Sequence, residues 1–324
     1  MASDGTMPVD RSGLRPEVRA LLEAIDRDPG PPLAGQTPAV RRALADVSLP
    51  SYWGEREEVA SVRDLVIPVA GGEVRARLYR PDRPEGTILF LHGGGWVVGS
   101  IETHDSSCRT FARRASCDVV SVEYRKAPEF PFPAAVGDAG AAIDWVIANG
   151  GELGIDTRHL VLAGDSAGAN LAAVAARHAR DRGIRLGGQV LVYPATDMAA
   201  ETATYDAFAD GFFLSAEAIR WFLGHYVPEP AHRLHPDASP IRAADLRHLA
   251  PALVITAAFD PLRDEGRAYA ARMIEAGNDV DYREWPGVIH GFWIMSGVTP
   301  AAIEAIDAAG AWVRARLAAA RTGG

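Results

Sequence analysis

A short apolar run, Leu160–Ala163, leads directly into the segment Gly-Asp-Ser-Ala-Gly at 164–168 and then into an alanine-rich stretch that ends near Arg180. The run predicts a buried strand, and the alanine-rich stretch predicts a helix. A strand that passes straight into a helix requires a tight turn, which strains its central residue. The two glycines carry no Cβ, so strand and helix can approach closely around Ser166. We therefore expect the Ser166 hydroxyl to project from the turn, beside the positive end of the helix dipole.

The pentapeptide alone is a weak signal, because glycine, serine and alanine are common residues. An ordinary strand-to-helix turn would also use small residues, and this reading stays open. The strand and the helix on either side supply the context in which a Gly-x-Ser-x-Gly serine acts as a nucleophile.

Strands and helices alternate along most of the chain. The segments that predict strands are 62–69, 74–79, 87–91, 119–124, 160–163, 189–193, 252–257 and 280–285. The segments that predict helices are 17–27, 38–47, 104–116, 133–148, 169–180, 262–276 and 300–320. The first two strands form a hairpin through Ala70-Gly71-Gly72. The pattern predicts an α/β fold with a mostly parallel eight-stranded sheet flanked by helices, and the hairpin supplies an antiparallel edge.

The alternation breaks between residues 195 and 250. Ser215 is placed as a helix N-cap before an apolar stripe at 219, 222, 223 and 226. We interpret this insertion, together with residues 1–50, as a helical cap over the carboxyl ends of the strands, where such sheets bind ligands. The expected organisation is an N-terminal part of the cap at 1–50, core at 51–194, a cap insertion at 195–250 and core again at 251–324.

Composition narrows the class of protein. The 324 residues carry a net charge of −9 with no long basic run, which disfavours binding to nucleic acid or to anionic membranes. No apolar run approaches the ~18 residues of a membrane span, and Met1–Met7 is too polar for a signal peptide. Cys108 and Cys117 lie nine residues apart and would point in opposite directions on a helix, so we expect no disulfide. These features predict a soluble cytoplasmic protein.

A nucleophilic serine needs hydrogen-bond donors for the oxyanion that develops in the reaction. The strand 87–91 is followed by His92-Gly93-Gly94-Gly95-Trp96. Consecutive glycines let backbone N–H groups point into one cavity, where they could act with the N–H of Ala167. Phosphate binding is a minor alternative, since the loop lacks the Gly-Lys-Ser/Thr ending of a P-loop and the spacing of a dinucleotide site.

The serine also needs a base, and His290 is the candidate because it alone follows a strand on the carboxyl edge after Ser166. His92 lies on that edge too, where a structural role in holding the glycine loop is the better interpretation. The histidines at 104, 159 and 178 have no placement there. Those in or near the cap, at 225, 232, 235 and 248, fit no standard zinc spacing, so no metal or cofactor is expected.

The acid that orients the base is expected to be Asp260, directly after strand 252–257. An aspartate before a proline is also a good helix N-cap, and one residue could fill both roles. Asp264 and Glu265 lie deeper in the following helix, and we expect both to face solvent. The chain order Ser166, Asp260, His290 is that of α/β-hydrolases.

Taken together, the motifs resemble the hormone-sensitive-lipase family of α/β-hydrolases, the bacterial family IV esterases. The matching segments are His92–Trp96, Val122–Glu129, Phe132–Ala135, Gly164–Gly168, Asp260–Glu265 and His290–Phe292. Glu123 and Lys126 depart from the family pattern, where aspartate and leucine are usual, which affects local packing rather than chemistry. The resemblance also implies that Asp165 is structural.

The resemblance implies a catalytic triad of Ser166, Asp260 and His290 and an oxyanion hole of Gly93, Gly94 and Ala167. It implies a carboxylic ester hydrolase that acts on small-molecule esters of short to medium acyl chains without a cofactor. Two alternatives remain: a non-catalytic ligand-binding protein of the same fold, and an amide or lactone hydrolase. Members of the family often dimerise through the last strand and helix, and a homodimer is left open.

Overall fold

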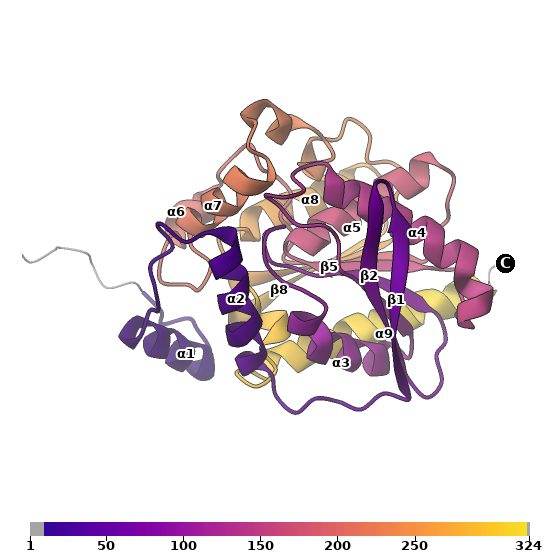
Figure 1. Ribbon diagram of the computed structural model, residues 1–324, viewed down its shortest axis with the longest axis horizontal. Helices are drawn as coiled ribbons and strands as arrows, with labels where there is room; N and C mark the ends of the chain where they lie inside the picture. Colours follow the sequence, from indigo (N-terminus) through magenta and orange to yellow (C-terminus); the bar gives the residue numbers. More distant parts are fainter. Residues whose placement is uncertain (1–9, 323–324) are drawn as a thin grey trace, which may run out of the picture.

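The computed structural model describes residues 10–322, so the polar segment Met1–Met7 lies outside the described residues. Within that range one eight-stranded sheet runs through the molecule in the order β1-β2-β4-β3-β5-β6-β7-β8 (Figure 1). Only the pairs β1–β2 and β2–β4 are antiparallel, as the hairpin predicted. The strands are β1 (Ser61–Val69), β2 (Gly72–Arg80), β3 (Thr87–Leu91), β4 (Asp118–Val122), β5 (Val161–Asp165), β6 (Gly188–Val192), β7 (Ala252–Phe259) and β8 (Val280–Ile289). The predicted fold class is confirmed.

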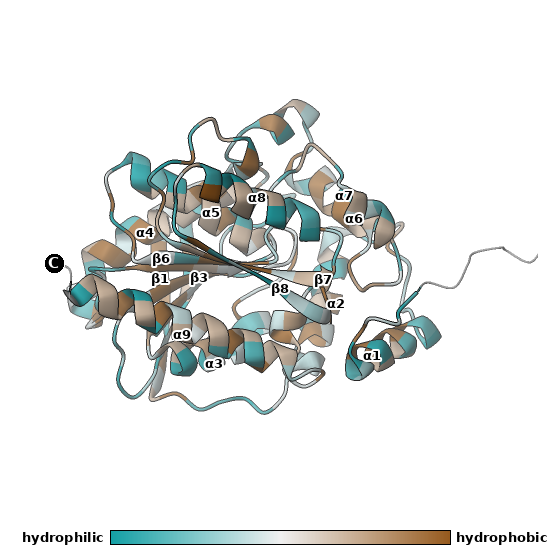
Figure 2. Ribbon diagram, turned by 180° about the vertical axis from the view of Figure 1, so that it is seen from behind, coloured by the Kyte–Doolittle hydropathy of each residue, from teal (hydrophilic) through white to brown (hydrophobic). Residues whose placement is uncertain are grey.

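Helices cover both faces of this sheet. Seen edge-on in Figure 2, α4, α5 and α8 lie on one side, and α3 and α9 lie on the other. Their bounds are α3 (Asp105–Ala115), α4 (Ala134–Leu153), α5 (Ala167–Asp181), α8 (Arg263–Glu275) and α9 (Ala301–Thr322). Alternate residues of each central strand enter opposite cores: Leu89 and Leu91 pack on one side, Ile88 and Phe90 on the other. This is why β3 to β6 are largely apolar and are buried along their whole length.

Four further helices gather at one end of the molecule, on the left in Figure 1. They are α1 (Pro16–Arg27), α2 (Pro38–Ser48), α6 (Ala203–Ala207) and α7 (Ala216–Tyr226). The Ser215 side chain accepts a hydrogen bond from the N–H of Ala218 and caps α7, as predicted. Tyr226 of α7 stacks on Trp96 of the glycine loop, with ring centroids 4.5 Å apart. The division into core and cap at 50, 194 and 250 stays a prediction.

The two cysteines and the lengths of the helices can be compared with what the composition predicted. Cys108 and Cys117 are both free and buried, and Cys117 lies beyond the end of α3 rather than on it. In the part of the chain that the structure describes, no helix combines the length and apolar character needed to cross a bilayer.

Candidate active site

The turn from β5 to α5 holds Ser166 in a strained conformation. Its φ of 53° and ψ of −118° lie in a region that residues other than glycine rarely adopt. The turn is tight enough that a Cβ added to Gly168 would lie 1.9 Å from the carbonyl oxygen of Leu91. Ser166 is thereby held between two packed elements at the carboxyl edge of the sheet.

We expect Gly168→Ala to destabilise the fold by more than about 3 kcal/mol, because the added methyl meets backbone atoms that cannot rotate away. Urea denaturation followed by circular dichroism measures the loss. The matched control is Gly140→Ala in α4, where a Cβ meets nothing within 4 Å and the helix should gain stability. Equal stability of the two variants would contradict a close contact at the turn.

Ser166, His290 and Asp260 form a continuous chain of hydrogen bonds. Nε2 of His290 lies 2.9 Å from Oγ of Ser166, and Nδ1 lies 2.7 Å from Oδ2 of Asp260. Because an ionised carboxylate only accepts, Nδ1 carries the hydrogen and Nε2 is free to accept the serine proton. Three loops that follow β5, β7 and β8 bring these side chains together, as the parallel sheet predicts.

Asp260 also fixes the chain around it. Its second oxygen, Oδ1, accepts a hydrogen bond of 2.8 Å from the N–H of Leu262 at the start of α8. The carboxylate is completely buried, and the imidazole beside it is 7% exposed. The ring of Tyr193 packs against the ring of His290 with centroids 4.5 Å apart. The imidazole is therefore restrained from two sides, by a hydrogen bond and by packing.

The expected role of Gly93 is wrong. Its N–H donates a hydrogen bond of 2.8 Å to Oδ1 of Asp165, so it is not free to meet an oxyanion. By contrast, the N–H groups of Gly94 and Gly95 meet no acceptor among residues 10–322. Both glycines line the same cavity as Ser166. The physical reason is that the buried carboxylate of Asp165 needs hydrogen-bond donors, and the N–H of Gly93 is one of those it takes.

Asp165 connects the glycine loop to the turn that carries Ser166. Besides Gly93, it lies 3.2 Å from Nε2 of His104 and 3.3 Å from the hydroxyl of Tyr193. Burial alone would raise the pKa of Asp165, but His104 and the Gly93 N–H outweigh burial and lower it below the ordinary value. The structural role expected of Asp165 agrees with these contacts. The prediction that His104 has no placement at this edge of the sheet is wrong, because His104 contacts Asp165 and lines the same cavity as Ser166. Its position depends on a contact between distant segments and not on a local pattern.

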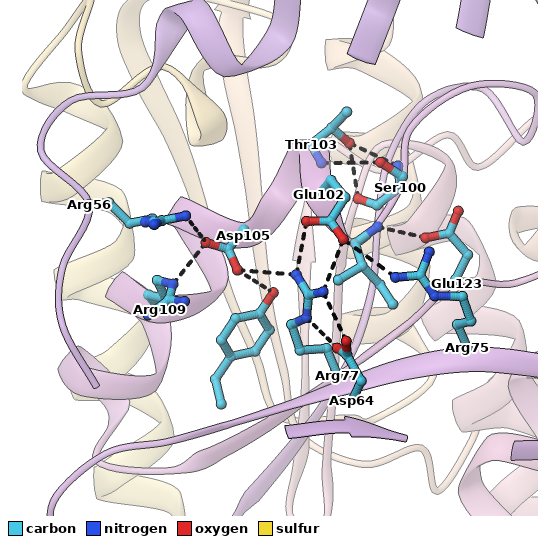
Figure 3. Close-up of polar contacts among 12 residues, drawn as sticks. Arg56, Asp64, Arg75, Arg77, Ser100, Glu102, Thr103, Asp105, Arg109 and Glu123 are labelled. Atoms are coloured by element: carbon cyan, nitrogen blue, oxygen red, sulfur yellow. Dashed lines mark hydrogen bonds and ion pairs between the residues drawn. The ribbon is translucent and has the colours of Figure 1, made fainter. Parts of the chain in front are cut away.

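The glycine loop is anchored at its far end by charged side chains (Figure 3). Arg77 of β2 binds Glu102 through two contacts of 2.9 Å, and Tyr79 and Arg109 bind Asp105. Glu123 accepts a hydrogen bond from the N–H of Ile101 at 2.8 Å. These contacts tie residues 101–105 to the sheet.

The two residues that depart from the family pattern form one unit. Nζ of Lys126 lies 2.5 Å from Glu123 and 2.8 Å from the carbonyl oxygen of Gly99. His92 stacks on Tyr124 with ring centroids 4.4 Å apart, and burial together with Lys126 lowers the pKa of His92 to about 3. His92 is thus a neutral ring inside the loop, which agrees with the structural role expected for it.

A cavity of about 470 Å³ opens beside Ser166 and His290. Its wall is mostly apolar and comes from the strand-end loops, from 25–52 and from 195–223. The apolar residues include Leu44, Leu49, Met198, Leu214, Ile219, Phe222, Leu223 and Ile294. This volume is typical of a small-molecule site. No three His, Cys, Asp or Glu side chains within residues 10–322 are grouped so that they could hold a metal ion.

The expectation that Glu265 faces solvent is wrong. Its side chain is buried and lines this cavity, and Oε1 accepts hydrogen bonds from the N–H groups of Thr196 and Asp197. On α8, Glu265 shares a face with Tyr269 and Met273, four and eight residues later, which are also buried. This helical spacing to two large apolar residues is the sequence pattern that indicates a buried position for Glu265. Burial raises the pKa of Glu265 to about 8.

This pKa predicts a stability change with pH that Glu265→Gln should remove. The folded protein holds the proton up to about pH 8, whereas an unfolded glutamate releases it near ~4.3, so stability falls as pH rises between these values. We expect the unfolding free energy of Glu265→Gln to exceed that of the natural chain increasingly over this range, with the difference growing by roughly 3 kcal/mol between pH 5 and pH 8. Urea denaturation at pH 5, 6.5 and 8 measures the difference. A difference that stays constant with pH would contradict a proton held by Glu265.

The eight-stranded sheet, the strained turn at Ser166 and the hydrogen-bonded chain beside it have the form of an α/β-hydrolase. Comparison with known proteins agrees, because the family model described as alpha/beta hydrolase fold matches residues 88–294. The chain belongs to the hormone-sensitive-lipase branch of this family, the bacterial family IV esterases, and is a carboxylic ester hydrolase. The resemblance seen in the motifs is thereby confirmed.

Two curated relatives and one solved structure illustrate the likeness. Ethyl acetate hydrolase of Pseudomonas putida is 35% identical over 308 residues, which are 90% of this chain and 96% of that protein. The carboxylic ester hydrolase LipN of Mycobacterium tuberculosis is 44% identical over 71% of this chain, and the match spans 64% of that protein, under two thirds of its length. The structure of an ester hydrolase from the metagenome of Lake Arreo superposes with a TM-score of 0.91 at 42% identity, covering 94% of this chain and 99% of that one.

Proposed function

We propose that the chain hydrolyses carboxylic esters through an acyl-enzyme formed on Ser166. Oγ attacks the ester carbonyl while Nε2 of His290 takes its proton, and Asp260 stabilises the imidazolium. The tetrahedral intermediate collapses, its bond to the alcohol oxygen breaks, and His290 passes the proton to the departing alcohol. Water then attacks the acyl carbon by the same route and releases the acid and the free serine. No metal or cofactor takes part in these steps.

The observation that carries the proposal is the position of His290, within hydrogen-bond distance of both the serine hydroxyl and the buried aspartate. For the oxyanion we propose the N–H groups of Gly94, Gly95 and Ala167, since Gly93 is bound to Asp165. One donor of this kind is typically worth ~3–4 kcal/mol of the barrier.

We further propose short to medium acyl chains as substrates, on the support of the cavity of about 470 Å³ with its aromatic and aliphatic wall. Rates on p-nitrophenyl esters from acetate to palmitate test both proposals. We expect kcat/KM to be highest between butyrate and octanoate and to fall steeply towards palmitate. Equal rates on palmitate would overturn the chain-length proposal. Hydrolysis of anilides or lactones without any ester hydrolysis would favour the alternative chemistry.

The two unpaired cysteines support a reducing compartment, and we propose the cytoplasm. We also propose a homodimer through β8, which is the last strand of the sheet and has one unpaired edge. Light scattering coupled to size exclusion would measure the mass in solution. A measured mass equal to that of one chain at every protein concentration would overturn the proposed homodimer.

A further inference from the structure

Two consecutive arginines on α2 differ completely in their surroundings. Arg42 is fully used: Nε donates to the carbonyl oxygen of Val97, and the guanidinium binds Glu129 through contacts of 2.8 and 2.6 Å. Arg41 forms no ion pair and no side-chain hydrogen bond with any residue between 10 and 322. Arg42 holds α2 on the glycine loop, whereas no contact of the Arg41 guanidinium within residues 10–322 does the same.

Arg41 lies on the cavity side of α2. The residues of this helix that line the cavity are 41, 44, 45 and 48, which recur at the spacing of one helix face. Arg41 is half-buried there, beside Leu44 and Tyr52, so part of its hydration is lost. Burial accordingly lowers the pKa of Arg41, although an arginine remains charged at any ordinary pH.

The other charged groups of the cavity wall leave this cation without a counter-charge. Asp197 is bound to Arg242 at 2.7 and 2.9 Å, and Asp165 is bound to Gly93 and His104. Glu265 holds a proton near neutral pH. The remaining carboxylate of the wall, Asp28, is exposed at the end of α1 and lies beyond ion-pair distance of Arg41.

We propose that Arg41 binds an anionic group of the substrate, so that the natural substrates are esters with a carboxylate, or a similar oxyanion, separated from the ester by an apolar spacer. The inference rests on the function proposed above and names its substrate class. A guanidinium can hold a carboxylate through two parallel hydrogen bonds, and such contacts are stronger where water is partly excluded. Arg41 and Ser166 line the same cavity, and the mostly apolar wall of that cavity suits the spacer.

Matched ester pairs test the proposal. On the acyl side, mono-p-nitrophenyl adipate is compared with p-nitrophenyl hexanoate, which has the same chain length with a methyl in place of the carboxylate. On the alcohol side, 4-acetoxybenzoate is compared with phenyl acetate. In the natural chain, one anionic ester should be hydrolysed at least as efficiently as its neutral partner. The ester pair whose ratio of kcat/KM changes when Arg41 is replaced then identifies the side of the ester that carries the anion.

In Arg41→Gln the ratio of kcat/KM for that anionic ester to its neutral partner should fall by about 10- to 100-fold, mainly through KM. Arg41→Lys should keep part of the preference. Arg27→Gln, which removes an exposed positive charge outside the cavity, should leave both ratios unchanged. If Arg41→Gln left the ratio of kcat/KM unchanged for both ester pairs, the inference about the anionic substrate would be overturned. The proposed ester hydrolysis would not be affected by that result.

A measurement on the natural chain keeps the test independent of how well the variants fold. Raising the salt concentration should raise KM for the anionic ester and leave KM for the neutral ester nearly constant, because ions screen a partly exposed charge pair. Equal salt responses of the two esters would count against Arg41. Absence of hydrolysis of all four esters by the natural chain would instead contradict the function proposed above.

Discussion

Replacing Ser166 with alanine is expected to lower kcat for ester hydrolysis by about 10⁵-fold or more and to abolish labelling by a fluorophosphonate probe. The reason is that the hydroxyl next to Nε2 of His290 is the atom that we propose forms the acyl-enzyme. Alanine removes that single atom and leaves the turn in place. The fold should therefore keep its melting temperature within a few degrees.

A serine outside the cavity supplies the control. Ser12→Ala, at an exposed position near the start of the described chain, should retain full activity and full labelling. Gel fluorescence and the rate on p-nitrophenyl butyrate measure both quantities in parallel. Labelling or appreciable turnover by Ser166→Ala would show that another residue is the nucleophile. A chain that binds esters but is never labelled would favour the non-catalytic alternative.

Asp260→Asn should lower kcat by about 10⁴-fold with little loss of stability. Oδ1 of asparagine can still accept from the N–H of Leu262 and cap α8. At the other oxygen, an amide NH₂ replaces the acceptor of the Nδ1 hydrogen, which favours the wrong imidazole tautomer. This variant should therefore lose most of its kcat while keeping nearly all of its stability.

Asp264→Asn is the matched control, because it removes a carboxylate four positions from Asp260 whose one hydrogen-bond partner among residues 10–322 is Arg263. Its kcat should stay within about twofold of the natural value. Steady-state kinetics and thermal unfolding of both variants measure the two effects. If Asp260→Asn kept its activity, or if Asp264→Asn lost as much, Asp260 would not be the residue that orients His290.

Much of the fold and of the site geometry could be predicted because both follow from local patterns. Short apolar segments that mostly alternate with helical ones lead to a mostly parallel sheet, and parallel strands collect the loops at their carboxyl ends at one edge. Ser166, Asp260 and His290 each lie directly after a strand in the sequence. Their proximity therefore follows from topology alone, before any side chain is placed.

Contacts between distant segments could not be predicted in this way. Whether the Gly93 N–H is free depends on the Asp165 carboxylate, which comes from another strand 72 residues later. His104, just before α3, reaches that same carboxylate across a long separation in the sequence. Glu265 is a different case, since its helical spacing to Tyr269 marked a buried face and its charge suggested the opposite. Burial of a carboxyl group becomes understandable only once the donors at Thr196 and Asp197 are seen.

The cavity draws its reacting groups and much of its wall from separate parts of the chain. Ser166, Asp260 and His290 each directly follow a strand of the sheet, whereas α2 and α7 bring the surfaces that a bound acyl group would touch. Substitutions on those two helices can change which compounds are accepted without disturbing the bond-making atoms. Selectivity in this enzyme can thus diverge, by natural drift or in a directed library, while the reaction it performs stays the same.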